Sequence, residues 1–99
     1  MRIYQVKIQW DLLSGTINNE FMELLSDKAD VKFETNCIVS RTFDPDGFLV
    51  ECEVPAVSPA DAITEVAAFV RPWIRQRRPV ITMVCSSVHA SLYQETEES

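Results

Sequence analysis

A mixed α+β fold is predicted by three observations in this sequence. Segments in which apolar and polar residues alternate occur near both ends and in the middle of the chain, as half-buried strands require. Two segments with apolar residues at helical spacing separate them. The 99 residues, 46% hydrophobic and 24% charged, have an ordinary globular composition and suffice for one core. We therefore expect a single α+β domain over residues 1–93 and an acidic, frayed tail over 94–99.

The first strand and the first helix are predicted from the beginning of the chain. Residues 3–10 alternate, with the apolar residues at even numbers, which indicates a strand with one buried face. The pattern breaks at residues 14–16. A helical pattern then extends over 17–28, and either Thr16 or Asn18 would serve as its N-cap.

A β-hairpin is predicted around the turn sequence Asp-Pro-Asp-Gly at residues 44–47. Apolar residues fall on odd numbers over 31–43 and on even numbers over 48–54. Proline presets φ in a turn and glycine accepts a positive φ, so this tetrapeptide favours a tight connection. If the proline and the second aspartate are its central residues, Phe43 pairs with Phe48 and the two apolar faces coincide. A three-residue loop ending in a glycine bulge would instead put those faces on opposite sides.

The second helix is predicted from a start signal and interrupted by a proline. Ser58 supplies a hydroxyl N-cap and Pro59 suits the first helical position. Pro72 lacks a backbone donor and clashes with the preceding turn, so we expect a kink or restart near Arg71. Pro79 then marks the end of the helix.

A long final strand over residues 80–93 completes the pattern, with its alternation disturbed around Ser86 and Ser87. The order strand, helix, strand, strand, helix, strand is the split βαβ pattern of ferredoxin-like folds. Right-handed crossovers would place both helices on one face of a four-stranded antiparallel sheet. The opposite face would then carry Gln5, Lys7, Gln9, Lys32, Glu34, Asn36, Ser40, Glu51 and Glu53.

Charge and cysteine usage limit the partners and the compartment. Fifteen acidic and nine basic residues give a formal charge of −6, which disfavours nucleic acid and anionic lipid and favours a partner with a basic surface. Cys37, Cys52 and Cys85 lie far apart in apolar stretches, which predicts buried thiols in a reducing compartment. No apolar run approaches the roughly 20 residues that span a bilayer, and the chain opens without a signal-peptide pattern. We therefore expect a cytoplasmic protein that does not contact membranes.

Motifs for catalysis and for metal binding are weak. Cys85 and His89 would share a metal ion only on a helix, because four residues of strand separate them by about 13 Å. The chain has two glycines, too few for a phosphate-binding loop or a nucleophile elbow. The sequence therefore favours a non-enzymatic role, and we expect no catalytic residue, no metal and no cofactor.

The function that we expect is a small, acidic protein–protein interaction module. Acids on and around the hairpin would contact a basic partner by charge complementarity. These candidate contacts are Glu34, Asp44, Asp46, Glu51 and Glu53. Small acidic proteins of this type include inhibitors, immunity proteins and virus-encoded antagonists of nucleic-acid-handling machines, so the specific expectation is an inhibitor of such a partner.

Two alternatives stay open from the sequence alone. A small dimeric enzyme or ligand-binding subunit would hold a pocket between sheet and helices. The candidate lining residues of that pocket are Trp10, Cys85, His89 and Tyr93. An anion-binding role would use the basic cluster near the end of the second helix, although helix C-termini attract arginine in any case. Its candidate residues are Arg71, Arg75, Arg77 and Arg78.

Overall fold

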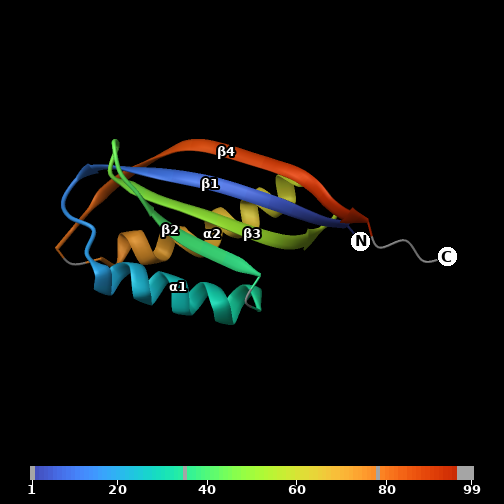
Figure 1. Cartoon of the computed structure of the whole chain (residues 1–99), viewed down its shortest axis with the longest axis horizontal. Helices are drawn as coiled ribbons and strands as arrows, with labels where there is room; N and C mark the ends of the chain where they lie inside the picture. Colours follow the sequence, from blue (N-terminus) through green and yellow to red (C-terminus); the bar gives the residue numbers. More distant parts are fainter. Residues whose placement is uncertain (1, 35, 78, 96–99) are drawn as a thin grey trace.

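The observed fold is a four-stranded antiparallel sheet with two helices on one face (Figure 1). The computed structural model describes residues 2–34, 36–77 and 79–95. Its elements are β1 (Arg2–Ser14), α1 (Asn19–Phe33), β2 (Cys37–Thr42), β3 (Gly47–Ala56), α2 (Pro59–Arg75) and β4 (Thr82–Glu95). The sheet order is β2-β3-β1-β4, and each neighbouring pair is antiparallel. This topology confirms the ferredoxin-like prediction.

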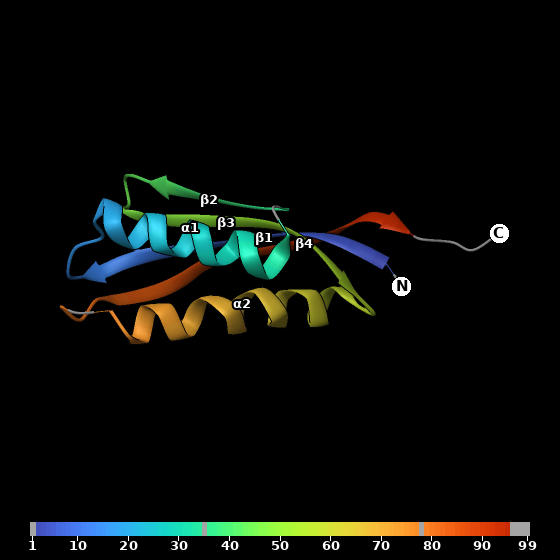
Figure 2. The ribbon, with the colours of Figure 1, turned by 90° about the horizontal axis from the view of Figure 1, so that it is seen from below.

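The two helices divide the covered face of the sheet between them. They lie side by side in Figure 2, where α1 covers β2 and β3, and α2 packs against β4 and β1. The core fills the space between these layers and centres on Phe48, whose side chain is fully buried. Its ring centroid lies 5.4 Å from that of Trp10 and 5.9 Å from that of Phe21. These aromatic contacts join the sheet to α1.

α1 extends further than the sequence predicts. It begins after Asn18, whose Oδ1 accepts a hydrogen bond from the backbone N–H of Phe21 at 2.9 Å, and it continues to Phe33. The expectation of a strand from Val31 onwards is therefore wrong. The buried residues of α1 recur every four positions through Phe33, which packs on α2 at 5.4 Å from the Phe69 ring. For the same reason, residues 32 and 34 do not lie on the open face of the sheet.

The β2–β3 hairpin has a different register from the one predicted. Arg41, not Phe43, pairs with Phe48, so the turn comprises four residues and not two. A shift of two positions keeps every side chain on its own face, which is why the apolar faces still coincide. Phe43 lies in the turn and is 70% exposed. Asp44 accepts a left-handed φ of 58°, and the Asp46 carboxylate accepts hydrogen bonds from the Arg41 guanidinium across the turn.

Gly47 is required by packing, and not by the turn. Its φ is not positive, whereas that of Gly15 is 95°. A Cβ at Gly47 would collide with the carbonyl oxygen of Trp10 and lie 3.0 Å from the Cα of Asp11. Because the obstacle is the backbone of β1, no rotamer change can relieve it.

α2 begins as predicted and is not interrupted. The Ser58 hydroxyl accepts a hydrogen bond from the backbone N–H of Asp61 at 3.2 Å, with Pro59 at the first helical position. The helix continues through Pro72 to Arg75, so the expected restart is wrong. The backbone N–H of Gln76 donates to the Pro72 carbonyl at 2.9 Å and closes the last turn. The helix therefore ends at Arg75, four residues before Pro79.

A β-bulge in β4 decides which of its side chains share a face. Gln9 pairs with Ser87 and Trp10 with Cys85, so Ser86 is the extra residue where the sequence predicts disturbed alternation. The bulge places Cys85 on the helix side and leaves His89, opposite Lys7, on the open side. The strand continues through residue 95, two residues past the predicted end, and residues 96–99 lie outside the described part of the chain.

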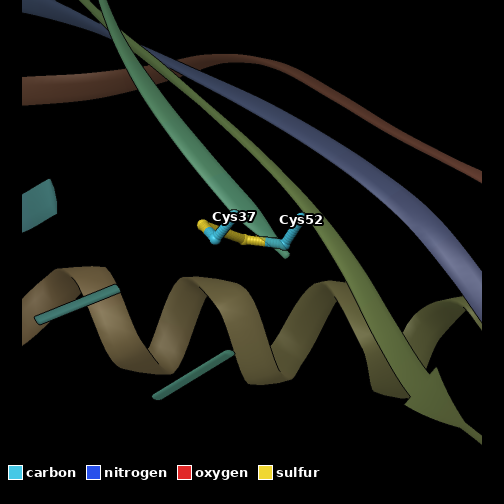
Figure 3. The surroundings of a disulfide bond; sticks show 2 residues. All are labelled: Cys37 and Cys52. Carbon is cyan, nitrogen blue, oxygen red and sulfur yellow. A yellow bond between two sulfur atoms is a disulfide. The ribbon is translucent and has the colours of Figure 1, made fainter. Parts of the chain in front are cut away.

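Cys37 and Cys52 form a disulfide between β2 and β3 (Figure 3). The observed register makes them direct cross-strand partners, with Cα atoms 4.1 Å apart. Both are buried, as predicted, but they are not free thiols. Cys85 is a free thiol and is exposed, so the expectation that it is buried is wrong.

Thiol counting tests this disulfide. Protein purified without reductant should show one reactive thiol, that of Cys85, in both native and denatured states, and three after reduction. Because the bond closes a loop of 15 residues, reduction should lower the free energy of unfolding by about 3 kcal/mol in a chain-entropy estimate. Three reactive thiols in unreduced, denatured protein would show that the bond does not form.

Candidate interaction surfaces

The five acids expected to bind a partner come from β3, from the β2–β3 turn and from the end of α1. Glu51 and Glu53 belong to β3 and face away from the helices, alternating with the buried residues of that strand. Asp44 and Asp46 lie in the β2–β3 turn, and Glu34 is the C-cap of α1. Glu34 and Glu53 line a common pocket, whereas Asp44 and Asp46 lie in the turn at the other end of the hairpin.

Two of these acids already have cationic neighbours within the molecule. The Asp46 carboxylate lies 2.7 Å from the Arg41 guanidinium, and that of Glu51 lies 3.7 Å from Nζ of Lys7. Both pairs are partly exposed, so their contribution to stability is small. They nevertheless reduce the local negative charge that a basic partner would meet on the hairpin.

The open face of the sheet is polar. Gln5, Lys7 and Gln9 of β1 pair with residues of β4 whose side chains share their side of the sheet, because directly paired residues point to the same face. These β4 residues are Ser91, His89 and Ser87. His89 therefore lies among solvated polar groups, on the face that no helix covers (Figure 1).

A row of acids that the sequence analysis missed follows the solvent side of α1. Their spacing of three and four residues places them on one face of the helix, opposite its buried residues. We call this row the α1 stripe, and its members are Glu20, Glu23, Asp27 and Asp30, with Glu34 following at the C-cap. All are exposed. Three of these acids lie within the helix predicted over 17–28, and the other two join the row only because the helix continues to residue 33.

The two lysines of α1 are turned away from this stripe, towards α2. Lys28 Nζ lies 5.7 Å from the centroid of the Trp73 ring, and Lys32 Nζ lies 3.8 Å from a carboxylate oxygen of Glu65. Val31, in contrast, is 81% exposed beside the stripe. The outer face of α1 thus combines acidic groups with an exposed apolar side chain.

A groove of about 370 Å³ lies between α2 and β4. Its floor and walls are mostly apolar, and its polar groups come from two arginines of α2. Its lining includes Trp10, Met83, Cys85, Val88, Arg71 and Arg75. Of the lining residues expected from the sequence, Trp10 and Cys85 line the groove. His89 lies on the opposite face, and Tyr93 is 54% exposed and is not part of the lining.

The basic cluster is divided by the structure. Arg71 and Arg75 line the groove, whereas the Arg77 guanidinium lies over the ring of Phe21 at 5.6 Å from its centroid. Arg78 lies outside the described residues. The three described arginines therefore do not form one anion-binding surface.

The described residues lack both a metal-binding cluster and a membrane-spanning helix. No group of three or more His, Cys, Asp or Glu side chains there is arranged to hold a metal ion. Nor does that part of the chain contain a helix with the length and apolar character needed to cross a membrane.

Comparisons with known proteins give no further guide to these surfaces. No protein-family model, no curated protein and no solved structure matches this chain. The functional interpretation therefore depends on the geometry and charge of the chain itself, since a fold alone does not define a function.

Proposed function

We propose that this protein is a non-enzymatic interaction module that binds a basic protein through the α1 stripe. The observation that carries the proposal is the segregation of charge on α1. Acids occupy its solvent side, and both of its lysines are engaged with α2. Charge complementarity of this kind speeds association and orients the partner.

The dimensions of the stripe suit an elongated basic surface. From Glu20 to Glu34 the helix rises by about 21 Å, with close to one carboxylate per turn. Val31 adds an apolar contact within this charged surface, as interface centres commonly do. Surfaces that bind phosphate backbones present rows of Lys and Arg. We therefore propose that the partner is a nucleic-acid-handling protein, whose basic groove the stripe occupies as an inhibitor.

Two charge-reversal variants of equal net charge test this proposal. Glu23→Lys/Asp30→Lys alters the stripe, and Glu51→Lys/Glu53→Lys alters the open face of the sheet, where the sequence analysis placed part of the site. We expect the stripe variant to bind its partner at least about tenfold more weakly at low salt, because like charges then face each other. The sheet variant should retain most of the affinity. Wild type and variants would be immobilised and used to capture partners from lysate of the producing cells, with quantitative mass spectrometry.

The outcomes separate the two surfaces. A basic protein captured by wild type, released at high salt and lost from the stripe variant alone supports the proposal, since exposed charge pairs are screened by salt. Loss from the sheet variant alone would move the site to Glu51 and Glu53. Capture that is insensitive to salt and to both variants would contradict a charge-driven interaction on either surface.

The proposal also assigns the protein to the cytoplasm, the location predicted from the sequence. The Cys37–Cys52 disulfide weighs against this location, because such bonds persist in oxidising compartments and are rare in the cytosol. Fractionation of the producing cells, with thiols alkylated before lysis, is the relevant measurement. Recovery of the protein outside the cytosolic fraction would contradict the assignment.

The groove between α2 and β4 favours a second candidate function, the binding of an amphipathic anion. Its volume of about 370 Å³ lies within the range of small-molecule sites, and Arg71 and Arg75 could contact an acidic group while the apolar walls contact the remainder. Anilinonaphthalene sulfonate is a suitable probe because it combines both features. We expect saturable binding by the native protein that Arg71→Gln weakens several-fold, as removal of a charged partner should. Absence of saturable binding would exclude this function for such ligands.

A further inference from the structure

β4 is an edge strand of unusual length. The sheet order leaves its outer side without a neighbouring strand in the described structure, and it is the topmost strand in Figure 1. It has 14 residues, whereas β2 at the other edge has six. The outward N–H and C=O groups of an edge strand form a ready template for a further strand.

This edge lacks the charged residues that normally prevent strand addition. Residues 79–94 contain no Asp, Glu, Lys or Arg in a chain that is 24% charged. Its bulges lie on either side of a regular stretch, because residues 87–92 pair with β1 without interruption. Natural edge strands are protected from pairing by charge, proline or bulges, and this stretch contains none of these.

The helix side of this stretch is apolar and incompletely covered. Val88 pairs with Ile8 and Leu92 with Tyr4, so both point to the side of the helices, yet they are 47% and 52% exposed. Val88 also borders the groove between α2 and β4. A strand added at this edge would cover both side chains and extend the wall of the groove.

The distribution of charge indicates which strand is added. A basic partner would meet no acid on residues 79–94 but would meet Arg71 and Arg75, which lie beside the first half of β4. The chain itself carries a charge of −6, so two copies repel each other least when they approach through an uncharged surface of this kind.

We propose that a second copy of this chain pairs with β4 antiparallel, about a two-fold axis near Ala90, and joins the two sheets into one. Directly paired residues must point to the same face of the joined sheet. With the axis near Ala90, Val88 pairs with Leu92 of the second copy, and both side chains point to the helix side. The second copy thereby completes the open side of the groove. This inference is independent of the α1 stripe, which lies on the helix layer and stays exposed in such a dimer.

Sedimentation velocity of the full chain over about 1–100 µM tests the dimer, a range that spans typical weak and moderate homodimers. We expect the average mass of the wild-type protein to reach twice the monomer mass within this concentration range. Leu92→Lys should raise the dissociation constant at least about tenfold, because it places a charge on a pairing edge. The matched control is Ile38→Lys, at a residue 63% exposed on the other edge strand, which should leave the dimer intact. Circular dichroism confirms that each variant is folded.

A charge-swap variant tests the register. Val88→Glu alone should weaken the dimer, whereas Val88→Glu combined with Leu92→Lys in the same chain should restore it, since each glutamate then meets a lysine of the other copy. Failure of the double variant to recover would overturn the antiparallel register. A wild-type chain that stays monomeric at the highest concentration, or an equal loss of dimer in Ile38→Lys, would overturn the interface.

Discussion

Phe48→Ala should lower the free energy of unfolding by about 3–5 kcal/mol, as expected when a fully buried aromatic side chain is removed. Phe48 contacts Trp10 from the neighbouring strand and Phe21 from α1, so its loss opens a cavity where the sheet meets the helix layer. Chemical denaturation followed by far-UV circular dichroism provides the measurement. If the variant does not fold well enough to measure, Phe48→Leu should show a smaller loss in the same direction.

Phe43→Ala is the matched control on the same hairpin. It should lower the free energy of unfolding by less than about 1 kcal/mol. Phe43 is 70% exposed, and its only described ring contact is with the Arg41 guanidinium, at 5.3 Å from its centroid. The register predicted from the sequence makes Phe43 and Phe48 direct partners on the buried face. In that register, Phe43→Ala and Phe48→Ala would lower the free energy of unfolding by similar amounts. Equal losses of stability would therefore contradict the observed register.

This hairpin shows what the alternation of residues can and cannot predict. Alternation has a period of two, so it identifies the buried face of each strand but is unchanged when the register moves by two residues. The length of the turn fixes the remaining choice, and here it depends on the left-handed φ of Asp44 and on the contact between Arg41 and Asp46. Neither is evident from the order of residues.

The boundary between α1 and β2 was missed for a related reason. Val31 and Phe33 alternate with polar neighbours and so satisfy the strand pattern, while Phe33 also continues the four-residue spacing of the helix. Packing decides between them, because Phe33 is buried against Phe69 of α2, a residue distant in the sequence. This boundary also hid the second half of the acidic stripe, because Asp30 and Glu34 lie beyond the predicted helix.

The groove was predicted only in part because of a single residue in β4. The sequence analysis assigned Cys85 and His89 to the lining of one pocket, and the bulge at Ser86 puts them on opposite faces of the sheet. The disturbed alternation indicated an irregularity but not its consequence. Tertiary packing brings Arg71 and Arg75 to the same groove, although the sequence analysis assigned them to a different function.

Gly47→Ala should lower the free energy of unfolding by at least about 3 kcal/mol. This value is at the upper end of what an extra methyl group costs in a packed protein interior. The added Cβ would overlap the carbonyl oxygen of Trp10, and relief would require β1 and β3 to separate where Gly47 pairs with Asp11. Ladder hydrogen bonds on both sides of this point would weaken. Equilibrium denaturation and hydrogen exchange of the β1–β3 amides would report the loss.

Asp46→Ala separates this steric effect from damage to the turn. It removes the salt bridge to Arg41 but adds no atom near β1. We therefore expect the free energy of unfolding to fall by less than about 1 kcal/mol, as is usual for a partly exposed ion pair. If Gly47→Ala proved as mild as Asp46→Ala, β1 and β3 would not approach each other as closely as the structure shows. A large loss confined to Gly47→Ala would establish that the glycine is needed for strand contact, which the turn pattern in the sequence does not indicate.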